Sequence, residues 1–277
     1  MITHGPRPTE VFLLDAYPAV AAYSLRKLRK EYTGSAIRVI RSSDNSEKDI
    51  GFNNKGDLNI TQLLDFVGNN DGYIDKFYNQ GTGGSTYDGR KEFGDGAKIV
   101  SNGNLLKEGG KPTVDFLMGD DAQPPLIVNN EILDIQTVFS VAKVNEFATV
   151  NYILGREPSD SIPAQGKFLG GTSNNVEGIG GFDGTNVPTL TNADLLRNLA
   201  YINIRGGDFY AAKNGASETN LGSFIAPLRA DRIFGRRAGL NTRLRGNVQE
   251  LIIFDSDENL NKSIIEDNIN NYYGIYF

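Results

Sequence analysis

The sequence predicts an all-β protein in which two sheets pack face to face as a sandwich. Eight segments are rich in β-branched and aromatic residues, and clusters of Gly, Asn and Asp separate them. The chain has 32 glycines, 12 tyrosines and 15 phenylalanines but no Trp and no Cys, a composition that suits aromatic strands joined by tight turns. At 277 residues it can bury a substantial core within one sandwich that carries elaborated loops.

The first segment, residues 1–15, is predicted to be an arm, and residues 16–277 to be one sandwich domain. Pro6 and Pro8 favour an extended chain, and the following VFLL supplies a short apolar plug. We expect this plug to dock on another subunit.

An amphipathic helix is predicted next, opened by Pro18 and closed by Gly34. Its apolar stripe, at helical spacing, consists of Ala21, Leu25, Leu28 and Tyr32. The basic residues on the remaining faces are Arg26, Lys27, Arg29 and Lys30. We interpret these charges as a solvated helix face and not as a phosphate-binding arm.

The predicted strands follow in chain order at 36–41, 73–79, 112–117, 135–144, 147–154, 199–205, 208–214 and 248–254. The segment 135–144 is apolar on both faces, which predicts a central strand, whereas 199–205 alternates as a half-buried strand does. Two helices interrupt the strands, at 60–68 and 261–274, and Gly274 is placed to cap the second. We expect the C-terminal helix to close the sandwich.

Composition excludes several function classes. The formal charge is −6, with 34 acidic against 28 basic residues, the reverse of what a nucleic-acid-binding protein carries. Without Cys, and with His4 as the only histidine, neither a catalytic triad nor a Cys-ligated zinc is expected, and we predict no metal and no cofactor. The start of the chain lacks the pattern of a signal peptide, and no apolar run is long enough to span a membrane.

The order of motifs resembles a known family. AAYSLRKL, GSAIRVIRSSDNSEKDIGF and GDLNITQLLDFVGNNDGYIDKFYNQ are similar to the N-terminal half of concanavalin A-like domains related to the arabinofuranosidase B catalytic domain. GNVQELIIFDSDENLNKSIIEDNINNYYGIY resembles the laminin-G-like end of the same jelly roll. The resemblance, which covers nearly everything from Ala19 to Tyr276, implies a concanavalin A-like jelly-roll β-sandwich with a few short peripheral helices. Such domains recur in phage tail and virion proteins.

The departures from this family bear on catalysis. Relatives read Tyr-Asp-Gln-Ser-Gly where this chain reads YNQGT, so Asn79 replaces an Asp beside Gln80. The resemblance implies a general acid in the Gly-rich stretch before the penultimate strand, yet the matching residues 235–247 contain no carboxylate. A retaining glycosidase needs two carboxyl groups, so we expect no catalytic residue and no enzymatic activity.

Other carboxylates are possible substitutes. Glu177 and Asp183 lie in a Gly-rich part of the loop-like stretch 155–192, but acids beside glycines are more often turn formers. The same interpretation applies to Asp120 and Asp121, and to GNNDGY at 68–73, which lacks the spacing of a calcium loop.

An arginine-rich stretch offers a second hypothesis about binding. Its six arginines, accompanied by a single carboxylate, Asp231, are Arg229, Arg232, Arg236, Arg237, Arg243 and Arg245. Pairing with carboxylates of other strands is the first interpretation, and a patch for an anionic partner is the alternative.

These observations and the resemblance together predict a non-enzymatic bacteriophage virion protein, a tail or capsid decoration that binds glycans or adheres to surfaces. A purely structural virion protein and a glycoside hydrolase of the arabinofuranosidase type stay open as alternatives. The candidate ligand residues are Asn79, Gln80, Asp183, Arg236 and Arg237.

The expected partners are other virion proteins, bound through the arm, and host-surface glycans, with a homo-oligomer left open and no nucleic acid or membrane. Because an adhesin-like fold normally works outside cells, the absence of an export signal suggests a protein made in the host cytoplasm and carried by the virion.

Overall fold

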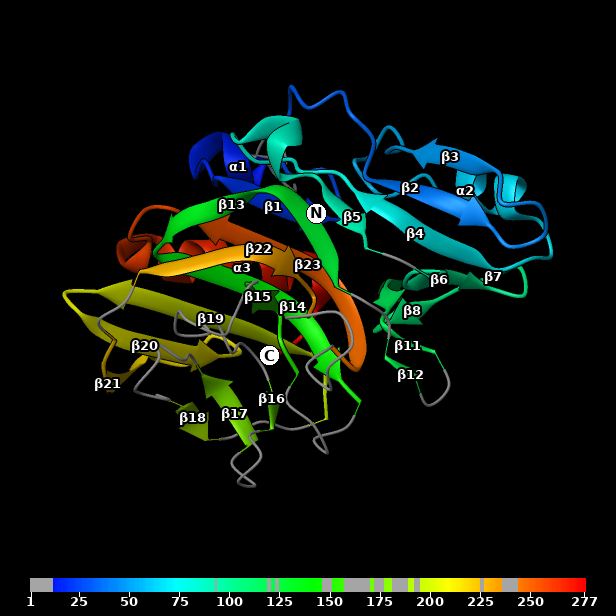
Figure 1. Cartoon of the computed structure of the whole chain (residues 1–277). Helices are drawn as coiled ribbons and strands as arrows, with labels where there is room; N and C mark the ends of the chain where they lie inside the picture. Colours follow the sequence, from blue (N-terminus) through cyan, green and yellow to red (C-terminus); the bar gives the residue numbers. More distant parts are fainter. Residues whose placement is uncertain are drawn as a thin grey trace, which may run out of the picture.

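The computed structural model describes residues 12–92, 94–118, 121–122, 125–145, 151–156, 170–171, 177–180, 189–191, 195–224, 227–235 and 244–277. Within these ranges the chain is mostly β-strand, with a few short helices at the periphery (Figure 1). The predicted all-β sandwich is therefore confirmed. None of the described helices combines the length and the apolar character that crossing a membrane requires.

The first half of the chain contributes mostly short strands. They are β1 (Ala21–Ser24), β2 (Ile37–Arg41), β3 (Glu47–Ile50), β4 (Gly72–Phe77), β5 (Gly89–Lys91), β6 (Lys98–Ser101), β7 (Asn104–Leu105), β8 (Lys107–Glu108), β9 (Lys111–Pro112), β10 (Val114–Asp115), β11 (Leu117–Met118) and β12 (Asp121–Ala122). The helices among them are α1 (Leu13–Ala16), α2 (Ile60–Val67) and the 3-10 turn η1 (Gly84–Tyr87).

The second half supplies the longer strands and the closing helix. Its strands are β13 (Leu126–Ile135), β14 (Thr137–Val144), β15 (Leu154–Gly155), β16 (Gly170–Gly171), β17 (Glu177–Gly180), β18 (Thr189–Thr191), β19 (Asn198–Arg205), β20 (Asp208–Lys213), β21 (Thr219–Ser223), β22 (Leu228–Ile233) and β23 (Gly246–Phe254). The 3-10 turn η2 (Asn259–Asn261) leads into α3 (Lys262–Tyr273).

Most strands share one hydrogen-bonded path, in the order β15-β22-β13-β5-β4-β6-β10-β23-β14-β19-β20-β21. β1 adds to β23, and β2 joins β4 to β3. β14 lies between β23 and β19, with Val138 opposite both Ile253 and Ile202. The prediction of a central strand at 135–144 is therefore confirmed.

Two apolar cores explain why these strands are apolar on both faces. Val138 and Leu251 point into the main core between the two layers of strands, together with Ile74 of β4 and Ile233 of β22. Alternate residues of the same strands form a second core on the outer face, where α3 covers them (Figure 1). Gly274 ends α3 in the left-handed conformation, as predicted.

The predicted helix between Pro18 and Gly34 is wrong. The segment 21–24 is a strand, all four of its residues are buried, and it pairs antiparallel with β23. Both of its faces are covered, because Tyr23 belongs to the main core and Ala22 to the second. Pairing with β23 and burial on both sides therefore prevail over the helical spacing of four apolar residues.

The predicted docking of the VFLL plug on another subunit is not what the structure shows for its leucines. Leu13 and Leu14 form part of α1 and are each 3% exposed, within the second core of the chain itself. Residues 1–11 of the predicted arm lie outside the described residues. The buried leucines make α1 part of the sandwich domain.

Candidate functional site

Asn79 and Gln80, two of the predicted ligand residues, are buried at the end of β4. The Asn79 side-chain oxygen accepts hydrogen bonds from the backbone N–H groups of Ala22 and Gly81, each at 2.7 Å. Its amide nitrogen donates to the carbonyl of Gly84 at 3.0 Å. The hydrogen bonds of the Asn79 side chain therefore connect β1 to the segment that follows β4.

Gln80 completes the same connection and is fully buried. Its side-chain oxygen accepts from the Leu28 N–H at 2.8 Å, and its amide donates to the carbonyls of Ser24 and Arg26 at 3.1 and 3.0 Å. A ligand therefore has no access to either amide, which corrects the prediction that they contact a sugar. Their role is to hold the segment 22–28, which carries Arg26, in place.

The other three predicted ligand residues, Asp183, Arg236 and Arg237, lie outside the described residues. Of the arginine-rich stretch, Arg229 lies 4.0 Å from the Glu131 carboxylate, and Arg232 lies 3.2 Å from that of Asp231 and 3.7 Å from that of Glu92. The predicted pairing with a carboxylate of another strand is confirmed for Arg229, since Glu131 belongs to β13, whereas the nearest carboxylate to Arg232, Asp231, belongs to its own strand β22.

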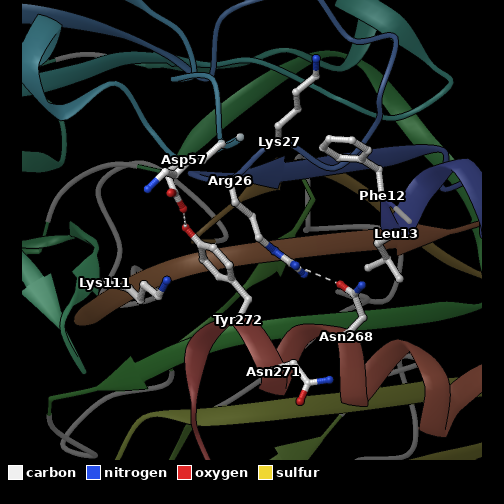
Figure 2. A pocket seen from close by; sticks show the side chains of 11 residues that line it. Phe12, Leu13, Arg26, Lys27, Asp57, Lys111, Asn268, Asn271 and Tyr272 are labelled. Atoms are coloured by element: carbon white, nitrogen blue, oxygen red, sulfur yellow. Dashed lines mark hydrogen bonds between the residues drawn. The ribbon is translucent and has the colours of Figure 1, made fainter. Parts of the chain in front are cut away.

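A pocket of about 430 Å³ opens on the outer face of the sandwich, beside α3 (Figure 2). Its wall comes from segments far apart in sequence, namely residues 12–13, the 26–27 segment after β1, the turn at 55–57, Lys111 of β9 and one side of α3. The volume lies within the usual range of small-molecule sites.

Arg26 lines this pocket and is 8% exposed. Its guanidinium forms a bidentate pair with the buried Glu250 of β23, with Nε–Oε2 and Nη2–Oε1 distances of 2.8 and 2.9 Å. The third bond runs from Nη1 to the Asn268 side-chain oxygen of α3, at 2.9 Å. Strand and helix are therefore joined at the pocket through one side chain.

The Glu250 carboxylate accepts hydrogen bonds from several donors. Besides Arg26, its Oε2 atom accepts from the Ser24 hydroxyl at 2.6 Å and from the Tyr273 hydroxyl at 3.3 Å. Burial alone lowers the pKa of Arg26, but the charge and hydrogen bonds of Glu250 outweigh that effect and raise this pKa above its ordinary value. Arg26 therefore keeps its positive charge inside the protein.

Tyr272 lines the pocket between Lys111 and Arg26. Its hydroxyl donates to the Asp57 carboxylate at 2.7 Å, and burial, followed by that hydrogen bond, raises the pKa of the phenol. The Lys111 ammonium lies 3.7 Å from the ring centroid and the Arg26 guanidinium carbon 4.9 Å from it, so in Figure 2 the ring lies between two cations. Such contacts stabilise the positive charges at the rim.

The pocket suits binding better than bond cleavage. Asp57 is the one carboxylate among its described lining residues, whereas a retaining glycosidase needs two carboxyl groups about 5–5.5 Å apart. Nothing in the sequence alone joins residues 26, 57, 111 and 272. The one available signal was Glu250, a carboxylate within the apolar strand segment VQELIIF, which predicts a buried cationic partner.

No protein-family model matches the chain, and a search of curated proteins found no match either. Solved structures do match. A GH54 α-L-arabinofuranosidase soaked with a cyclic sulfate inhibitor superposes with a TM-score of 0.64 at 15% identity, over 96% of this chain and 65% of that chain. An arabinofuranosidase complexed with arabinofuranosyl-α-1,2-xylobiose gives a TM-score of 0.64 at 15% identity, over 94% of this chain and 64% of that one.

A third match is a Glu-to-Gln mutant of a GH54 α-L-arabinofuranosidase soaked with 4-nitrophenyl α-L-arabinofuranoside, with a TM-score of 0.64 at 14% identity. The chain spans 65% of that protein's length, slightly less than two thirds, as it does for the first match.

These matches correct the functional prediction. The fold over nearly the whole chain is that of glycoside hydrolases, and all three matches are arabinofuranosidases, so the prediction of a non-enzymatic virion protein is wrong. At these identities the likeness establishes the fold. The chain has the β-sandwich fold of carbohydrate-active GH54 arabinofuranosidases.

Proposed function

We propose that this chain is a glycoside hydrolase domain of the arabinofuranosidase type, which cleaves a terminal α-L-arabinofuranosyl group from a saccharide. The observation that carries the proposal is the superposition on arabinofuranosidase structures over 94–96% of the chain, including one complexed with arabinofuranosyl-α-1,2-xylobiose. Fold alone does not determine activity, so the proposal also needs carboxylates that can do the chemistry.

Glu177 and Asp183 are the carboxylates that we assign to this reaction. Both belong to the Gly-rich sequence VEGIGGFDG, and glycines leave room for a ligand to approach the backbone closely. Glu177 begins β17, which pairs with β16 and β18 in a separate three-stranded sheet. In this proposal Glu177 and Asp183 supply the carboxyl groups that residues 235–247 lack, and Asp183 itself lies outside the described residues.

The position of this small sheet suits a site away from the Arg26 pocket. β17 and β18 contact β20, and Ile179 of β17 packs in the main core. The Arg26 pocket borders α3, which covers the opposite face of the same layer of strands. β17, the strand that begins at Glu177, and the Arg26 pocket therefore lie on opposite faces of that layer.

The assay that tests the proposal uses 4-nitrophenyl α-L-arabinofuranoside and the full chain. We expect release of 4-nitrophenol above the rate in buffer and above the rate with heat-denatured protein. The matched substrates are 4-nitrophenyl α-L-arabinopyranoside and β-D-xylopyranoside, which carry the same leaving group on a six-membered ring. Equal rates on all three substrates, or no release from the furanoside, would contradict the proposal.

A further inference from the structure

The Arg26 pocket carries positive charge that the chain itself does not neutralise. Within the described part of the chain, no carboxylate forms an ion pair with Lys27, Lys55 or Lys111, although all three line the pocket. The Lys27 ammonium instead lies 5.8 Å from the Phe12 ring centroid, and that of Lys111 lies over Tyr272. In a chain with a formal charge of −6, this concentration of cations favours an anionic ligand.

Arg26 adds a fixed donor to these lysines. A guanidinium has five N–H donors, and three of those of Arg26 are bonded to Glu250 and Asn268. The remaining two have no partner among the described residues, while Glu250 fixes the orientation of the group. A fork held in this way matches the two oxygens of a carboxylate.

The rest of the lining offers groups that hydroxyls can bond. Asn268 and Asn271 of α3 both line the pocket, and Figure 2 shows the Asn268 amide facing Arg26, from which its oxygen accepts a hydrogen bond. Amides both donate and accept, as the hydroxyls of a sugar do. Asp57 opposes an anion, but the three lysines among the described lining residues outnumber it.

We propose that the Arg26 pocket binds an acidic sugar, with the carboxylate of a uronic acid residue beside Arg26 and Lys111 and its hydroxyls on the α3 amides. The carboxylate of the ligand is proposed because Lys27, Lys55 and Lys111 have no carboxylate partner within the described part of the chain. The saccharide part rests on the proposed function, because a hydrolase acting on branched polysaccharides gains from a second contact with a charged part of the same chain.

Titration calorimetry with full-length protein tests this proposal. The probes are D-glucuronic acid and D-galacturonic acid, with L-arabinose as the neutral sugar and acetate as the plain carboxylate. We expect at least one uronic acid to bind about tenfold more tightly than both controls, and its binding to weaken as NaCl rises from 50 to 500 mM, roughly the range over which screening becomes strong.

Variants then locate the site. Lys111→Met should weaken uronic acid binding about fivefold, the size of one partly exposed ion pair, and Lys111→Arg should restore most of it. The matched control is Lys30→Met, an exposed lysine in the same basic stretch that does not line the pocket. It should leave binding unchanged.

The outcomes separate this inference from the proposed function. Uronic acid binding without furanoside cleavage would contradict the proposed hydrolase activity and support the acidic-sugar site. Cleavage without uronic acid binding would overturn the pocket proposal alone. Equal binding of acetate and uronic acid would overturn the saccharide part, and equal loss in Lys30→Met and Lys111→Met would overturn the location.

Discussion

Replacing Glu250 by Ala is expected to lower the free energy of unfolding by about 3–5 kcal/mol. The substitution leaves the Arg26 guanidinium buried without its counter-charge, since both side chains are almost completely enclosed. It also removes the acceptor of the Ser24 and Tyr273 hydroxyls. Urea unfolding followed by circular dichroism at pH 7 measures this change.

Two further variants make the result specific to a buried charge. Glu47→Ala removes an exposed carboxylate of β3 and should change stability by no more than about 0.5 kcal/mol. The double variant Arg26→Met with Glu250→Leu removes both charges and should recover most of the loss. Removing one partner of a buried ion pair leaves an uncompensated charge, whereas replacing both partners by apolar side chains does not. A loss below about 1 kcal/mol in Glu250→Ala, on the scale of a surface pair, would contradict this account.

Glu177→Gln is expected to reduce kcat/KM for 4-nitrophenyl α-L-arabinofuranoside by about 10²–10⁴-fold. Glutamine keeps the size of the side chain but can neither attack the anomeric carbon as a carboxylate nor exchange a proton with the leaving oxygen. Asp183→Asn should cause a loss of the same order, since the mechanism uses both groups. Initial rates across a substrate series measure these losses.

The control for these variants is Glu31→Gln, which changes an exposed carboxylate far along the chain from the Gly-rich stretch and should retain the wild-type rate. Thermal unfolding of each variant shows whether the fold is intact. Full activity in Glu177→Gln, with an unchanged unfolding midpoint, would exclude this residue from the reaction.

Much of the fold could be predicted from local pattern. The segment 135–144 is apolar on both faces because two cores cover it, and such a run has few other interpretations. The C-terminal helix has a clear apolar stripe and a capping glycine, so its end at Tyr273 could be predicted to the residue.

The helix prediction for the segment 21–32 was wrong for a physical reason. A short strand buried on both sides also places apolar residues at helical intervals, and no local rule separates the two. Its partner, β23, lies more than 220 positions away in sequence, with Ser24 opposite Glu250. Only long-range pairing decides between helix and strand in such a case.

The pocket could not be predicted, because its walls meet only in the folded chain. Arg26 and Glu250 are separated by 224 positions, and Asp57 and Tyr272 by 215. Asn79 and Gln80 do form a motif, but the role predicted for them is wrong, because a buried amide that bonds backbone groups looks in sequence like one that bonds a sugar.

The most direct test of the central claim is a proton NMR time course of arabinofuranosyl-α-1,2-xylobiose with the wild-type chain. Anomeric signals of the trisaccharide, of free arabinose and of xylobiose are resolved from one another, so cleavage is seen without a coupled assay or an artificial leaving group. A glycoside hydrolase of the arabinofuranosidase type will release arabinose and xylobiose in equal amounts. An intact trisaccharide after prolonged incubation with folded protein would contradict the claim.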